Sequence, residues 1–223
     1  MVLTIPQLED DEVFIPTDAN AGRIIQLHEF EKNLVTLVNV GQYQAIRSVQ
    51  AAGWDNAMSL AGDWRTYFYS KEHQDDPKLK AYYESVAKGI KYAARWTRTQ
   101  VHDLRSEHPF VVNVSRVHSE FDLPLYEEKV IDVSWLPKRD GYIQELDEET
   151  GLPREVGSEP NKRFDGTRYW VEYGLSEKRD IVAAIRSRFD SRPFLSLYLV
   201  PGLASGGLGV RPEKIFPRKI FRK

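Results

Sequence analysis

The sequence lacks cysteine, long apolar runs and a clear excess of either charge. Without cysteine there are no disulfide bonds, thiolate nucleophiles or cysteine-ligated metal sites. No apolar stretch approaches the roughly 20 residues that a helix needs to span a bilayer, and the chain turns acidic by Glu9, unlike a secretory signal. We therefore expect a cytoplasmic or virion protein, without a signal peptide, a transmembrane segment or a membrane partner.

The near balance of charge hides a segregation along the chain. The 223 residues carry 31 basic and 33 acidic side chains, for a formal net charge of -2. Residues 1–22 contain acids but no Lys or Arg, whereas residues 211–223 are strongly basic. Such blocks are typical of solvated arms and interaction tails. We expect an acidic extended arm at 1–22 and a glycine-rich linker with a basic tail at 201–223.

Helical periodicity dominates residues 23–108, where apolar residues recur every three or four positions. The best-defined element begins with Asp76, a good N-cap, and Pro77, which fits the first helical position. The apolar rhythm continues from there to Leu104. These features predict a helical half built on one long spine helix. Three shorter helical patterns precede it, around Leu34, Ile46 and Trp64.

After Pro109 the apolar period changes to two, as in strands with two distinct faces. A segment from Ser176 to Phe189 has the N-cap and the charge distribution of a short helix. The predicted class is α+β, with a mainly antiparallel sheet and one short helix in residues 109–200. Extended charged arms flank a compact unit over residues 23–200.

Candidate catalytic and metal-binding residues are few. The five histidines have no spacing typical of a helical zinc site, and the glycine-rich segment 202–209 is not followed by the helix that a phosphate loop requires. We assign no catalytic, metal-binding or cofactor-binding residue and expect no cofactor. One alternative is the Glu-x-Lys pattern of Mg²⁺-dependent nucleases at Glu127 and Lys129. An acidic loop before a strand explains the same residues.

The strongest functional pattern is a row of basic residues on the predicted spine helix. Steps of three or four place its members on one helical face, with Trp96 beside them. The row consists of Lys88, Lys91, Arg95, Arg98, His102 and Arg105. Such a row is a solvated face, or it binds an acidic protein segment or a phosphate backbone with stacked bases.

The basic tail contains the one internal repeat. Lys214-Ile215-Phe216 recurs as Lys219-Ile220-Phe221, with Arg218 between the two copies. We expect the tail to bind a groove of a neighbouring molecule through its apolar residues, in a head-to-tail contact.

These patterns favour a non-enzymatic structural or assembly protein that acts in a homo-oligomer or a larger complex, such as a virus or phage particle. Its expected partners are copies of itself or an acidic protein surface, contacted through the charged arms and the basic helix face. The alternative is a nucleic-acid-binding protein that uses Lys91, Arg95, Arg98 and Trp96. A Mg²⁺-dependent nuclease is the weaker alternative.

Overall fold

The computed structural model describes residues 7–10, 12–18, 21–26, 41–87, 94–118, 121, 123–171, 181–189, 192–199, 201 and 208–216. These residues form mostly strands. The helices are α1 (Gln42–Ala51), α2 (Leu60–Glu72) and α3 (Pro77–Ala87), with a 3₁₀ turn η2 (Lys162–Phe164). The strands are β1 (Glu12–Asp18), β2 (Ala21–Gln26), β3 (Asn56–Ala57), β4 (Ala94–His102), β5 (Phe110–Val117), β6 (Pro124–Tyr126), β7 (Ile131–Asp132), β8 (Gly141–Leu146), β9 (Pro153–Gly157), β10 (Arg168–Val171), β11 (Ile181–Phe189), β12 (Arg192–Leu199), β13 (Leu208–Val210) and β14 (Pro212–Phe216).

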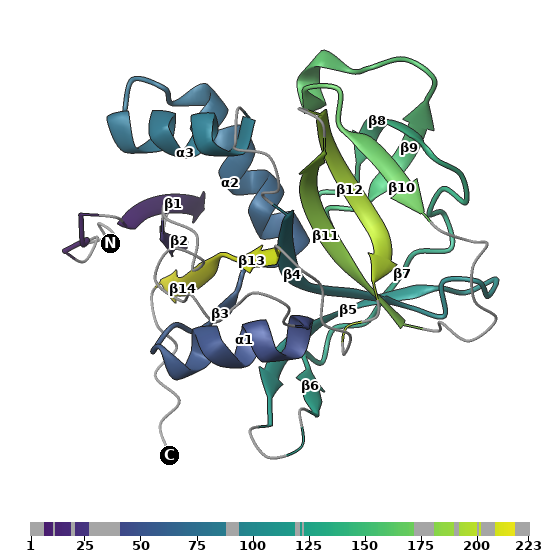
Figure 1. The fold of residues 1–223 in the computed structure, drawn as a ribbon, viewed down its shortest axis with the longest axis horizontal. Helices are drawn as coiled ribbons and strands as arrows, with labels where there is room; N and C mark the ends of the chain where they lie inside the picture. Colours follow the sequence, from purple (N-terminus) through teal and green to yellow (C-terminus); the bar gives the residue numbers. More distant parts are fainter. Residues whose placement is uncertain are drawn as a thin grey trace.

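The strands form two sheets. The small sheet has the order β1-β2-β14-β3 and is antiparallel throughout. The large sheet has the order β6-β5-β4-β11-β12-β10-β8-β9, with β13 beside β4 and β7 beside β5. In Figure 1, β4 lies between the small sheet with α2 and α3 on one side and strands β8 to β12 on the other. Sequence-distant strands therefore meet at β4.

The predicted long spine helix is wrong. The helix begins as expected, because Asp76 Oδ1 accepts a hydrogen bond from Lys78 N at 2.8 Å, and the structure describes it as Pro77–Ala87. The remainder of the predicted helix contains β4, which pairs with β5 on one side and β11 on the other. All side chains from Trp96 to Val101 are buried. A strand covered on both faces has no period-two pattern, so its apolar residues can coincide with helical spacing.

The short helix predicted at Ser176–Phe189 is also wrong, because Ile181–Phe189 is strand β11. It pairs with both β4 and β12, and its residues from Val182 to Ile185 are buried. The protein is therefore mainly β, instead of a helical half joined to a sheet. The short helices around Ile46 and Trp64 are confirmed as α1 and α2. The helix predicted around Leu34 lies outside the described residues.

The segments predicted as charged arms contribute strands to the small sheet. Residues 12–18 form β1, which pairs with β2, and residues 212–216 form β14 between β2 and β3. Residues 21 and 22 begin β2, and residues 208–210 form β13 beside β4 of the large sheet. The other described residues of the two predicted arms are 7–10, 201 and 211, and the rest lie outside the described residues.

Helix α2 connects the cores of the two sheets. Trp64 and Tyr67 belong to the large core, beside strands β4, β5 and β8 to β12. Tyr69 packs against the core beneath the small sheet, which includes Ile15 and Ile25. A separate core lies between α1 and the strands β4 and β5, with Trp96 at its centre. The start of α2 is thereby held at the junction of the sheets.

Candidate interaction site

The β5–β6 hairpin concentrates apolar side chains on the surface. Within the described residues, seven large apolar side chains are exposed, and five of them lie between residues 121 and 130. Their exposed fractions range from 36% to 68%. The five residues are Phe121, Leu123, Leu125, Tyr126 and Val130. Single exposed apolar residues are common, but such clusters mark interaction surfaces. These five residues are called the hairpin patch below.

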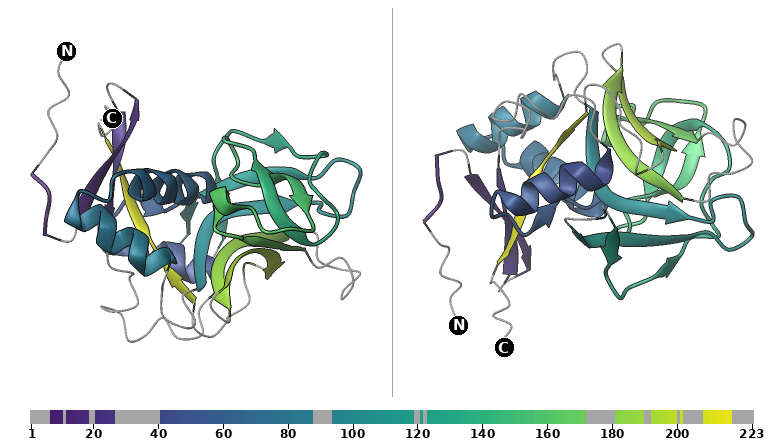
Figure 2. Two further views of the ribbon diagram at one scale, coloured as in Figure 1. Left: turned by 90° about the horizontal axis from the view of Figure 1, so that it is seen from above. Right: turned by 60° about the horizontal axis from the view of Figure 1, so that its bottom comes forward.

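Strand β6 lies at an edge of the large sheet. It pairs with β5, so that Tyr126 lies opposite Val114 and Leu125 lies opposite Arg116. Ser115 Oγ donates a hydrogen bond to the Leu125 carbonyl at 3.0 Å. The hairpin extends away from the body of the protein (Figures 1 and 2). An edge strand presents backbone N–H and C=O groups that another strand can pair with.

The base of the hairpin is anchored to the rest of the protein. Burial raises the pKa of Tyr126, and its interaction with Tyr43 of α1 raises it further. The His102 ring lies edge-on to Tyr126, with 5.4 Å between ring centroids. Burial lowers the pKa of His102, although the charge of Asp103 opposes this effect. The patch is therefore presented from a fixed base.

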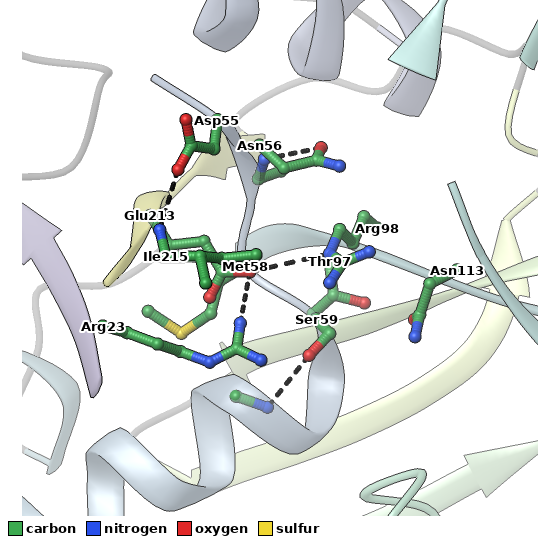
Figure 3. A network of polar contacts seen from close by, with 12 residues as sticks. Arg23, Asp55, Asn56, Met58, Ser59, Thr97, Arg98, Asn113, Glu213 and Ile215 are labelled. Carbon is green, nitrogen blue, oxygen red and sulfur yellow. Dashed lines mark hydrogen bonds and ion pairs between the residues drawn. The ribbon is translucent and has the colours of Figure 1, made fainter. Parts of the chain in front are cut away.

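Charged side chains meet inside the protein around Glu213 of β14, which is fully buried. Its Oε1 forms an ion pair with Arg23 Nη1 of β2 at 2.5 Å and lies 3.6 Å from Arg98 Nε of β4. Figure 3 shows the two arginines near Glu213 and Ser59. The charge of Glu213 raises the pKa of Arg23 above its ordinary value, against the opposing effect of burial. This cluster fastens β14 to β2 and β4.

Arg98 extends the polar network toward the hairpin. It pairs through Nη1 with Glu127, which follows β6, and Asn113 Nδ2 donates to Glu127 Oε2 at 3.2 Å. Thr99 Oγ1 donates to Asn113 Oδ1 at 2.7 Å and accepts from Leu60 N at 3.0 Å. A continuous set of contacts therefore joins the base of the hairpin to the first residue of α2.

Two cavities adjoin the start of α2. The larger, of about 460 Å³, lies between α2, β1 and the turn after β8. Trp64 and Phe68 form its aromatic floor, stacked with 5.6 Å between centroids. Gly151 has φ +76 and lies so close to α2 that a Cβ at this position would be only 2.7 Å from Ala61 N. Glycine is therefore needed where this turn meets the helix. The smaller cavity, of about 240 Å³, is lined by Arg23, Arg98 and neighbouring polar residues.

The structure does not bring the predicted basic row together on one surface. Trp96 is 1% exposed and packs under α1, and Arg98 is buried in the ionic network. Arg105 is exposed in the turn after β4. Arg95 is part of β4, but its side chain lies outside the described part of the chain, as do Lys88 and Lys91. The single helical face on which the row depended does not exist, because Ala94–His102 is strand β4.

The first copy of the tail repeat is part of the small sheet. Lys214 pairs with Glu12 at 2.8 Å, and its Nζ lies 4.1 Å from the centroid of the Trp54 ring. Ile215 is 44% exposed and Phe216 ends β14. The second copy, with Arg218, Lys219, Ile220 and Phe221, lies outside the described residues.

The nuclease pattern is occupied by ion pairs. Glu127 pairs with Arg98, and Lys129 pairs with Glu149. Within the described residues, no group of three or more His, Asp or Glu is placed to hold a metal ion. Both charged residues of the Glu-x-Lys pattern therefore form ion pairs with other residues of the chain.

Sequence reasoning missed the hairpin patch, although a signal was present. Phe121, Leu123 and Leu125 alternate with polar residues or proline, which is the pattern of a strand with one apolar face. Pro124 and the surrounding acids made this segment read as a loop. Period-two spacing beside an edge-favouring proline indicates an edge strand instead.

The described helices are all too short or too polar to cross a bilayer. The chain was also compared with families, with curated proteins and with solved structures. No family model, curated protein or solved structure matches it.

Proposed function

We propose that the protein is a non-enzymatic assembly protein that associates with copies of itself through the β5–β6 hairpin. The hairpin patch is the observation that supports this proposal most directly. Five exposed apolar side chains within ten residues, beside an edge strand, provide both apolar area and backbone pairing groups. Natural proteins usually protect such edges. A partner that covers this edge would remove the apolar side chains from water and pair the free backbone groups of β6.

A second copy is the partner that we propose. Antiparallel pairing is self-complementary, because two β6 strands related by a two-fold axis can each use the same surface. Extension of a sheet across such an axis would also bring the two copies of Leu125 close together. The buried positions of Trp96 and Arg98 reduce support for the nucleic-acid alternative.

Light scattering after size exclusion tests the proposal. The 25.8 kDa chain is expected to form a dimer or a larger oligomer, and the double variant Leu123→Ser with Leu125→Ser is expected to be monomeric. Trp170→Ser is the matched control, because Trp170 is also exposed but lies on β10, outside the hairpin.

Circular dichroism should show that all three proteins are folded. A wild-type protein that stays monomeric at every concentration would refute the proposal. Retention of the oligomer in the hairpin double variant would refute it too.

A further inference from the structure

The smaller cavity gathers cationic side chains from four separate parts of the chain. Arg23 comes from β2, Arg65 from α2, Arg98 from β4 and Lys129 from the segment after β6. All four line the same pocket of about 240 Å³. Their convergence requires the tertiary fold, because no two of them are close in the sequence.

The N-terminus of α2 lies at the same pocket. Ser59 and Ala61 both contribute to its lining, and Ser59 Oγ accepts a hydrogen bond from Gly62 N at 3.1 Å. The N-terminal end of a helix carries partial positive charge that favours anions. The helix here has 13 residues, enough for a developed dipole.

Arg98 is a buried donor whose hydrogen bonds are incomplete. Its side chain is 5% exposed and lines the pocket, but its Nε makes no hydrogen bond to the part of the chain that the structure describes. The Glu213 Oε1 atom lies 3.6 Å away from this nitrogen, beyond good hydrogen-bond distance. A buried donor without a hydrogen bond costs free energy that a suitable acceptor would recover.

The charges around the pocket leave positive charge available. Four cations face Glu127 and Glu149 in the lining and Glu213 behind it, so one positive charge remains. Arg65 accounts for it: its Nη2 donates to the Glu148 carbonyl at 3.1 Å, and it forms no ion pair within the described residues.

Glu127 occupies the mouth of the pocket as an internal anion. Its side chain is 37% exposed, whereas that of Glu213 is fully buried. Glu127 accepts from both Arg98 and Asn113, the contacts that an external oxyanion would make. Because its carboxylate can return to solvent, its displacement costs much less than that of Glu213.

We propose that this pocket binds a small oxyanion of the phosphate class. Arg65, Arg98 and the N-terminus of α2 would hold it, and the Glu127 carboxylate would move aside. Arginine is suited to this task because its planar guanidinium binds two oxygens of a phosphate group at once. The site does not rest on the proposed oligomer, because none of the five residues of the hairpin patch lines the pocket, although Glu127 directly follows β6.

Titration calorimetry with inorganic phosphate at low ionic strength tests the site, using variants with opposite expected effects. Arg65→Gln removes a charged donor and should weaken binding about tenfold. Glu127→Gln keeps the size of the side chain but removes the competing charge, so binding should become several-fold tighter. Lys138→Gln, an exposed cation outside the pocket lining, should leave the affinity unchanged.

The same titration with acetate distinguishes a phosphate site from a general attraction for anions, because acetate should bind at least tenfold more weakly. The proposal is overturned if the wild-type protein does not bind phosphate at tens of millimolar. It is also overturned if Arg65→Gln and Lys138→Gln weaken binding equally, or if Glu127→Gln weakens it. Oligomeric state measured in parallel keeps failure of this site separate from failure of the assembly proposal.

Discussion

The hairpin patch and the Glu213 cluster each reverse the usual distribution of side chains. The patch exposes apolar residues such as Phe121 and Leu125, whereas the cluster removes Arg23, Arg98 and Glu213 from most of the solvent. The buried charges find opposite charges within the same chain. The exposed apolar residues have no comparable cover within the described part of the protein.

This difference separates a structural role from a role in binding. A buried carboxylate between two guanidinium groups specifies which strands meet, because any other arrangement would leave a charge unpaired in the interior. An exposed apolar cluster adds little to the stability of the isolated chain, because most of its side-chain surface stays in water. We propose that a partner covers this cluster, so mutations in the two regions should change the stability of the isolated chain by very different amounts.

The largest effect is expected from Glu213→Ala. It leaves Arg23 and Arg98 without their shared carboxylate, and breaking a buried pair costs about 3–5 kcal/mol. Chemical denaturation would measure the loss in free energy of unfolding. Glu149→Ala is the matched control, because its ion pair with Lys129 is exposed and is worth less than about 1 kcal/mol. Equal losses in both variants would contradict a special role for the buried cluster.

An intermediate effect is expected at Asp165, whose charged side chain is 32% exposed. Asp165 accepts hydrogen bonds from Tyr67, from Lys71 at 2.7 Å and from Tyr83 at 3.2 Å. Asp165→Asn should destabilise the protein by about 1–3 kcal/mol, since charged hydrogen bonds are lost. Asn also tolerates the left-handed conformation at φ 49, so the backbone should not be strained. Thermal unfolding would measure the change, and an unaltered melting temperature would contradict it.

Asp165 also predicts a pH dependence. Burial raises its pKa, but the hydrogen bonds from Lys71 and the two tyrosines, with the Lys71 charge, outweigh burial and lower it. The unfolded state therefore takes up this proton first as the pH falls. The stabilisation that the Asp165 carboxylate contributes should be complete above pH 3.8, the ordinary pKa of aspartate. It should be lost as the pH falls from there through the lowered pKa of the folded protein. Asp165→Asn should lose less stability than the wild type over that range in acid unfolding experiments.

A smaller pH effect is expected from His102 at the base of the hairpin. Its lowered pKa means that the unfolded state binds the proton more readily. Stability should therefore fall as the pH drops below the ordinary value of 6.5. The loss should stay below about 1 kcal/mol, because the ring is partly solvated. His102→Phe preserves stacking on Phe110. In this variant the free energy of unfolding should change less with pH between about pH 7 and 5 than in the wild type.

The smallest effect on stability is expected in the patch itself. Leu125→Ser, measured on monomeric protein at low concentration, should change the free energy of unfolding by no more than about 0.5 kcal/mol. The side chain is 54% exposed, so little apolar contact is lost. A loss comparable with that of Glu213→Ala would show that the patch is packed within the chain, and the contrast between the two regions would disappear.

The sequence predicted elements with local signals and failed where tertiary contacts decide. Asp76 and Pro77 mark the start of α3 correctly, because capping depends on adjacent residues. The end of α3 and the start of β4 were missed, since Thr97 and Val101 are buried by strands from elsewhere in the chain.

In the candidate site, too, the sequence identified individual residues but not the tertiary contacts between them. Arg98 and Glu127 were identified as functional residues, yet their ion pair depends on a strand pairing that charge spacing does not encode. Glu213 lies in the segment 211–223 that the sequence analysis described as strongly basic, and only the folded chain shows that Arg23, 190 positions earlier, is its partner. A charge balance along the sequence has no information about such distant pairs.

The position of β14 also limits the order in which the protein can fold during synthesis. This strand lies between β2 and β3, so the β1–β2 hairpin waits for residues that follow every strand of the large sheet in the sequence. Until then, Arg23 and Arg98 have no Glu213, and the exposed edges of the unfinished sheet are open to non-native pairing. Completion of the small sheet therefore comes after synthesis of every strand of the large sheet.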